Sequence, residues 1–111
     1  MKLNRYTTVA HAVKALKQRG FTAEFKLNAE TQRMRNLESG KSYPPKGMEI
    51  VEYHRFEGMS NPGDMSIVFA VETADGSKGI IISSYGMYAD MELVEFIDKV
   101  KIKERTASAK N

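Results

Sequence analysis

One short segment of the sequence gathers side chains that could do chemistry, in the run HRFEGMSNPGD: His54, Arg55, Glu57 and Asp64. A histidine or an oriented carboxylate can act as a general base, and an arginine guanidinium holds carboxylate or phosphate through a fork of donors. In a small enzyme, Glu57 or Asp64 would be the base. His54 would be the acid–base partner of this carboxylate, and Arg55 would bind an anionic group of the substrate. This hypothesis requires the side chains to meet in one pocket.

A plainer interpretation of the same segment is a structural hairpin. Residues two apart on a strand share a face, so Arg55 and Glu57 lie together and His54 faces the other way. An Arg–Glu pair on a sheet is most often a structural ion pair or a solvated surface. Pro62 and Gly63 predict a type II turn from Asn61 to Asp64. The segment has no glycine-rich run followed by lysine, so it is not a phosphate-binding loop.

The second candidate segment is SSYGMYAD, residues 83–90, where a strand end runs into a helix start. Loops at a helix N-terminus often bind anions, and Gly86 allows close approach of the backbone. Tyr85 and Tyr88 could stack on a ligand or donate hydrogen bonds to it. In the alternative interpretation the tyrosines lie at the edge of the core and Asp90 only caps the helix.

Several kinds of chemistry find no support in the sequence. Without cysteine, disulfides and thiolate catalysis are excluded. His11 and His54 are isolated and lack the spacing of zinc ligands, so we predict no metal site. A Gly-x-Ser-x-Gly elbow is also missing, which leaves a serine hydrolase without support. We predict no cofactor.

Charge is distributed unevenly along the chain, although the net charge is only +3. Residues 1–55 carry +6, residues 56–98 carry −7 and residues 99–111 carry +4. This arrangement predicts complementary contacts within the fold or between copies, and it differs from the continuous basic face of a nucleic-acid binder. No window is long and apolar enough to span a membrane, and the N-terminus does not have the pattern of a signal peptide. We therefore predict a cytoplasmic protein with no membrane partner.

The periodicity of the sequence predicts a helix, four strands and a second helix. Val9, Ala12, Val13 and Leu16 mark a helix over residues 7–19 that ends at Gly20. Strands are expected at 21–28, 48–58, 65–74 and 79–85, with a disturbed alternation near residues 50–51 that indicates a bulge and a hairpin turn at residues 75–76. A helix from residue 90 carries a second apolar stripe. Residues 29–47 remain a long connection that could hold a helical turn.

This order predicts an α+β fold: a four-stranded, mainly antiparallel sheet with the N-terminal and C-terminal helices packed on one face (α-β-β-β-β-α). Residues 1–103 would form a single domain and residues 104–111 a flexible basic tail. The edge of a small antiparallel sheet also predicts pairing into a homodimer.

Three blocks of the sequence resemble a family of short, uncharacterised Bacteroidetes proteins: AVKALKQRGFTAEF, YHRFEGMSNPGDMSIVFAV and DGSKGIIISSYGMYAD. Members of that family are often labelled phosphoribosylpyrophosphate synthetase. The true synthetases are much longer and carry an acidic, glycine-containing ribose-phosphate loop that this chain lacks, so the residues argue against that activity. The resemblance implies a bacterial, cytosolic source. It would place a site on the following residues: Arg55, Glu57, Asp64, Tyr85, Tyr88 and Asp90.

Taken together, the sequence favours a non-catalytic binding or regulatory module for a small anionic ligand or a protein partner. The alternatives are the small enzyme with an Arg/His/carboxylate site and a weak nucleic-acid binder that uses the N-terminal half and the tail. The last alternative predicts salt-sensitive binding.

Overall fold

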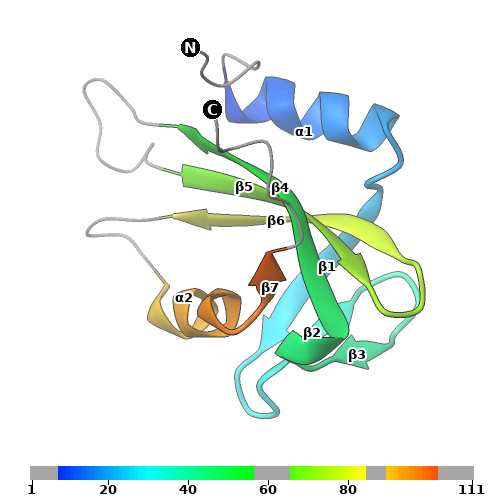
Figure 1. Cartoon of the computed structure of the whole chain (residues 1–111), viewed down its shortest axis with the longest axis vertical. Helices are drawn as coiled ribbons and strands as arrows, with labels where there is room; N and C mark the ends of the chain where they lie inside the picture. The colour runs from blue at the N-terminus through cyan, green and yellow to red at the C-terminus, as the bar shows by residue number, and fades with distance from the viewer. Residues whose placement is uncertain (1–7, 57–65, 85–89, 103–111) are drawn as a thin grey trace.

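A computed structural model describes residues 8–56, 66–84 and 90–102, which form two helices and a seven-stranded mixed sheet (Figure 1). The strand order across the sheet is β3-β2-β1-β6-β5-β4-β7. In chain order the elements are α1 (Val9–Gln18), β1 (Ala23–Asn28), β2 (Arg33–Asn36), β3 (Ser42–Tyr43), the short 3₁₀ turn η1 (Pro45–Gly47), β4 (Met48–Phe56), β5 (Ser66–Thr73), β6 (Lys78–Ser84), α2 (Met91–Asp98) and β7 (Lys101–Ile102). The α+β class is confirmed. The prediction of a four-stranded antiparallel sheet with both helices on one face is wrong.

Helix α1, Val9–Gln18, lies within the predicted range and is followed by Gly20 as the sequence predicts. The Thr8 side chain accepts a hydrogen bond from the His11 backbone N–H, which satisfies one of the open donors of the first turn. At the other end Gly20 has a φ of +104°, and the Phe21 N–H donates to the Leu16 carbonyl at 3.0 Å. This is the left-handed ending that favours glycine, and Phe21 packs with Leu16 in one buried cluster.

The centre of the sheet is the antiparallel meander of β4, β5 and β6. Its first hairpin is interrupted by a register shift between Ile50 and Glu52, which confirms the predicted bulge. The turn between β5 and β6 contains Gly76 at a φ of +94°, as the Asp-Gly pair predicts. Two pairings are parallel, β1 with β6 and β4 with β7, so the sheet is mixed.

The connection expected over residues 29–47 holds two short strands and η1. Strand β2 alternates buried Met34 and Asn36 with exposed Arg33 and Arg35, a pattern only four residues long. Asn36 is 3% exposed, and its side chain accepts backbone hydrogen bonds from Glu38 and Ser39. The strand therefore ends in a turn that the Asn36 side chain stabilises. The sequence did not predict β2 because a strand of four residues is too short to show a repeated apolar pattern.

The two helices lie on opposite faces of the sheet because the central strands are apolar on both sides. Along β5, Val68 and Ala70 pack in one cluster with Leu16 of α1, whereas Phe69 and Val71 pack in another with Phe96 of α2. We call the sheet face that carries the cluster with Leu16 the α1 face, and the sheet face that carries the cluster with Phe96 the α2 face. A strand that buries both of its faces needs a cover on each, and one helix supplies each cover. A second helix on the same face would leave the other row of β5 in water.

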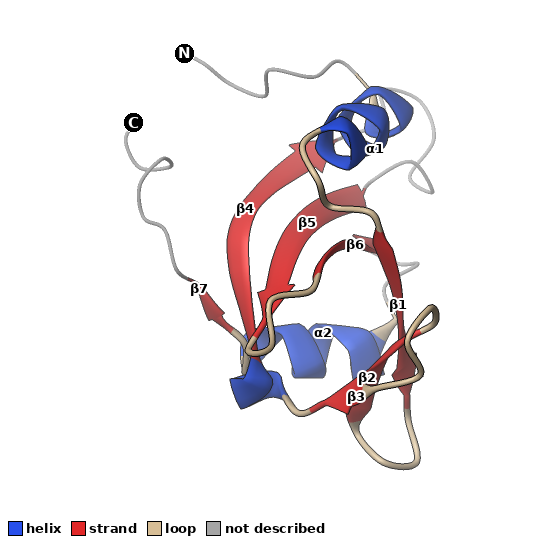
Figure 2. Ribbon diagram, turned by 90° about the vertical axis from the view of Figure 1, so that its right-hand side faces the viewer, coloured by secondary structure: helices blue, strands red, loops and turns tan. Residues whose placement is uncertain are grey.

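The sheet also curls, as Figure 2 shows. Residues from distant strands in the sheet order, Met34 and Tyr43 from β2 and β3 and Ile50 from β4, share the α2-face cluster. Only a curled sheet brings such strands around one core, so the fold resembles half of a barrel. Among the described helices, none is long and apolar enough to cross a membrane. The predicted tail, residues 104–111, lies outside the described residues.

Candidate functional site

The strand register brings the described parts of the two candidate segments on β4 and β6 to the same end of the sheet. Phe56 at the end of β4 is paired with Ser66 at the start of β5, and Ser66 is paired with Ser84 at the end of β6. The described ends of three neighbouring strands, β4, β5 and β6, therefore lie in one row. Glu57, Asp64, Tyr85 and Tyr88 lie outside the described residues. Arg55 and Asp90 are the candidate residues that the structure describes.

Arg55 is exposed on the α2 face, one residue before this row. Its strand partner is Ile67, which packs against the α2-face cluster. His54 is paired with Val68, which belongs to the α1-face cluster. The structure therefore separates the two side chains by the thickness of the sheet, and the pocket that the enzyme hypothesis built from His54 and Arg55 does not form from them.

Asp90 caps α2, as the plainer interpretation of its segment predicts. Its Oδ1 accepts hydrogen bonds from the backbone N–H groups of Glu92 at 3.1 Å and Leu93 at 3.3 Å. These bonds satisfy two donors of the first helical turn. The side chain thus fixes where α2 begins, on the same sheet face as Arg55.

His54 belongs to a polar network that the sequence did not reveal. Its Nε2 lies 2.6 Å from Oε2 of Glu52, and Nη2 and Nη1 of Arg19 donate to the Glu52 carboxylate at 2.7 and 3.0 Å. The hydrogen bond from His54, followed by the bond and charge of Arg19, lowers the pKa of Glu52 from 4.5 to about 2, against partial burial, which raises it. The bulge before Glu52 turns this carboxylate toward α1.

The Arg19–Glu52–His54 network supplies the orienting carboxylate that a catalytic histidine requires. The same carboxylate is held from the other side by Arg19, at the C-cap of α1. The His54 side chain is only 12% exposed. In this arrangement the network joins the end of a helix to a strand, and it lines neither of the hollows described below. The i, i+2 spacing of Glu52 and His54 was the available sequence signal, because the two share a strand face.

A second polar cluster surrounds Asp75 in the turn between β5 and β6. Its carboxylate accepts hydrogen bonds from Thr73 Oγ1, from Tyr43 Oη at 2.8 Å and from Lys41 Nζ at 3.4 Å. The bonds from Thr73 and Tyr43 lower the pKa of Asp75 from 3.8 to about 2. The cluster fastens β3 to the turn between β5 and β6 and helps to hold the curl.

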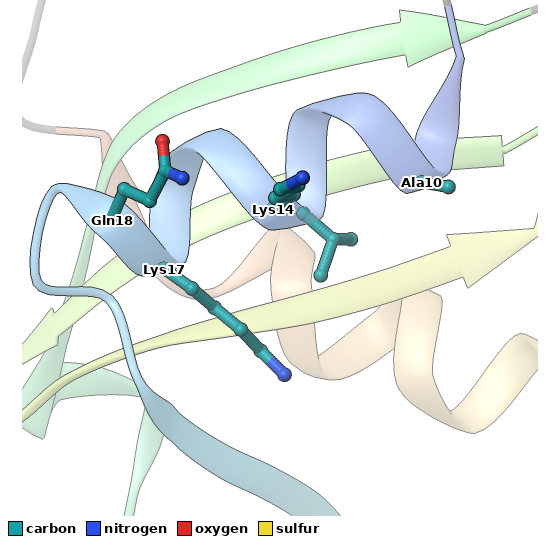
Figure 3. A pocket seen from close by; sticks show the side chains of 5 residues that line it. Ala10, Lys14, Lys17 and Gln18 are labelled. Atoms are coloured by element: carbon teal, nitrogen blue, oxygen red, sulfur yellow. The ribbon is translucent and has the colours of Figure 1, made fainter.

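Hollows on the described surface include one along α1 and one beside η1. The larger, about 550 Å³, lies along α1 and is lined by Ala10, Val13, Lys14, Lys17 and Gln18 (Figure 3). The smaller, about 320 Å³, lies beside η1, where Glu49 and Glu72 face each other across β4 and β5. Within residues 8–56, 66–84 and 90–102, no three histidine or acidic side chains are placed to hold a metal ion.

Comparisons with known proteins give no relative: no protein-family model, no curated protein and no solved structure matches the chain. The resemblance to the Bacteroidetes family therefore stays a prediction based on the quoted blocks of sequence.

Proposed function

We propose that the chain is a non-catalytic binding module that takes up a small anionic ligand at the end of the sheet formed by β4, β5 and β6. The observation that carries the proposal is the row Phe56–Ser66–Ser84. In this row the described ends of β4, β5 and β6, next to which the candidate polar residues stand in the sequence, lie side by side. Residues that follow the strands of a rigid scaffold commonly bind ligands.

Arg55 is the residue that we propose contacts the ligand. It is exposed, and its guanidinium matches the planar, paired oxygens of a carboxylate or phosphate. It lies on the same sheet face as α2, whose first turn is capped by Asp90. The separation of Arg55 from His54 supports binding without catalysis, since this histidine lies on the other face of the sheet from an anion held by Arg55.

A thermal-shift screen against nucleotides, sugar phosphates and carboxylates tests this proposal. A ligand present at about a hundred times its dissociation constant adds roughly 2.7 kcal/mol to the free energy of unfolding, which raises the melting temperature. The proposal expects the shift to disappear in Arg55→Ala. The matched control is Lys46→Ala, which removes an exposed cation on η1, away from the β4–β5–β6 row and from the other surfaces discussed below. A shift lost in both variants, or in neither, would count against a site at Arg55, and a screen without hits would redirect the search to a protein partner.

A further inference from the structure

A basic patch covers the α1 face of β1 and β2. Lys26 of β1 lies directly opposite Arg35 of β2, and Arg33 is two residues from Arg35 on the same face. All three side chains are exposed, and none forms an ion pair with a described residue. Like charges directly opposite each other on a sheet destabilise it. The patch therefore has a positive charge that the described part of the fold leaves largely uncompensated.

The patch has an apolar end. Leu37 follows β2, its N–H donates to the Glu24 carbonyl at 2.9 Å, and its side chain is 50% exposed. Glu24, across from Leu37, is the acidic residue of β1 on this face. From Leu37 to Arg33 the patch spans five residues, which is four residue steps or about 13 Å of extended chain, in the order apolar, basic, basic.

An acidic stripe runs along the solvent side of α2. Glu92, Glu95 and Asp98 are exposed, while Leu93, Phe96 and Ile97 face the core. No ion pair joins these acids to any residue that the structure describes, including Lys99 at the end of the helix. At one end of the stripe stands Met91, which is 61% exposed.

The acidic stripe and the basic patch have opposite charges and similar lengths, and their residues follow the same order along each surface. From Met91 to Asp98 the helix rises about 10.5 Å, close to the length of the patch. Both surfaces begin with an exposed apolar side chain and continue with charges, negative on the helix and positive on the sheet. The charges of the patch are two residues apart on a strand, a spacing of about 6.8 Å. The charges of the stripe are three residues apart on a helix, where Cβ atoms three or four residues apart have a similar spacing of about 5–6 Å.

We propose that copies of this chain associate head to tail, with the acidic stripe of α2 on one copy seated on the basic patch of the next. The two surfaces lie on opposite faces of the sheet, so one molecule cannot satisfy its own patch. For the same reason a two-fold dimer cannot form both contacts at once. The contact is heterologous and continues into a chain or a ring of copies. This proposal is independent of the anion site at Arg55.

Analytical ultracentrifugation at two ionic strengths tests the association. At about 0.01 M salt the screening length is ~30 Å, and at about 1 M it is ~3 Å. We expect the average mass to exceed that of the 12.5 kDa monomer at low salt and to rise with protein concentration, and to return to 12.5 kDa at high salt. A monomer throughout the low-salt series would overturn the proposal.

Charge reversal then identifies the surfaces. One variant carries Lys26→Glu and Arg35→Glu, and the other carries Glu95→Lys and Asp98→Lys. Each variant alone carries the same net sign of charge on both surfaces and should stay monomeric. An equimolar mixture restores opposite signs and should associate as the natural chain does. Glu92 is left unchanged, since a lysine in the first turn would oppose the helix dipole.

Controls separate the proposal from a folding defect. Circular dichroism and the melting temperature should match the natural chain, and the neutral pair Lys26→Gln with Arg35→Gln replaces the reversed pair if that one unfolds. Lys46→Glu, on the exposed η1, changes charge outside both surfaces and should associate normally. Association that persists in either reversed variant, or a mixture that stays monomeric while both variants are folded, would refute the contact.

Discussion

Arg19 and Glu52 form a two-pronged ion pair, with N–O distances of 2.7 and 3.0 Å, that joins the C-cap of α1 to the middle of β4. Helix α1 otherwise packs mainly over β5 and β6. The pair therefore extends the attachment of the helix by one strand toward the edge of the sheet. His54 completes the arrangement by donating to the same carboxylate.

Replacement of Glu52 by glutamine should destabilise the protein in a pH-dependent way. The pKa of Glu52 in the fold is about 2 and its ordinary value is 4.5, so the charged carboxylate stabilises the fold above pH 4.5. That stabilisation is lost as the pH falls toward 2. We expect Glu52→Gln to cost about 1 kcal/mol at neutral pH, the upper end for a partly exposed ion pair. Urea unfolding of both proteins from pH 2 to 7 measures the difference, and a gap that stays constant over this range would contradict the assignment.

The two-faced core predicts which pairs of core substitutions are coupled. Leu16 and Val68 belong to one cluster, while Val71 belongs to the other. Leu16→Ala should cost about 2–5 kcal/mol and each valine-to-alanine change about 2 kcal/mol. Leu16→Ala with Val71→Ala should be additive within about 0.5 kcal/mol, whereas Leu16→Ala with Val68→Ala should deviate by more than that. Denaturant unfolding of the two double-mutant cycles provides the measurement. Equal coupling in both cycles would argue against separate clusters.

Much of the local structure could be predicted because single residues determine it. Gly20 ends α1, Asp90 begins α2, and the Asp-Gly pair makes the turn after β5. Each signal acts over a few neighbouring residues, so the sequence alone contains it.

The arrangement of the sheet could not be predicted in the same way. The apolar run of β5 indicates a central strand but does not say that a separate helix covers each face. The parallel pairing of β1 with β6 joins residues more than fifty positions apart, Ala23 and Gly79, and depends on how the faces are covered. The partners of Glu52 and Asp75 were missed for the same reason, because Arg19 and Tyr43 reach them only through tertiary packing.

Removal of each hydrogen-bond donor around Asp75 should raise the pKa of its carboxyl group, and the size of the rise should differ between the donors. The bond from Thr73 has the largest lowering effect, the bond from Tyr43 the next, and the bond from Lys41 a smaller one. We expect the pKa of Asp75 to rise from about 2 toward 3.8 most in Thr73→Val, less in Tyr43→Phe and least in Lys41→Gln. A titration of the Asp75 carboxyl carbon by NMR gives the three values. An unchanged pKa in Tyr43→Phe would mean that β3 is not fastened to this turn.

Among the glycines that the structure describes, Gly79 is expected to tolerate a side chain least, because the atom that an added side chain would meet belongs to the backbone. A methyl group there would collide with the Ala23 carbonyl oxygen and come within 2.5 Å of the Phe25 ring. Since Gly79 is paired with Ala23 in the parallel ladder, the strands must separate to admit it. Overpacking costs about 1–3 kcal/mol, and we expect Gly79→Ala to reach the upper end of that range, about 3 kcal/mol.

The matched control for this substitution is Gly76→Ala. Gly76 has a φ of +94° and open space around it, so alanine there meets only the backbone penalty of roughly 1–2 kcal/mol. Hydrogen exchange distinguishes the two variants better than stability alone. Gly79→Ala should accelerate exchange at the amides of β1 that face β6, while Gly76→Ala should leave β1 protected. If the β1 amides exchanged hydrogen at the same rate in both variants, the close packing of β1 against Gly79 would not be what holds β1 and β6 together.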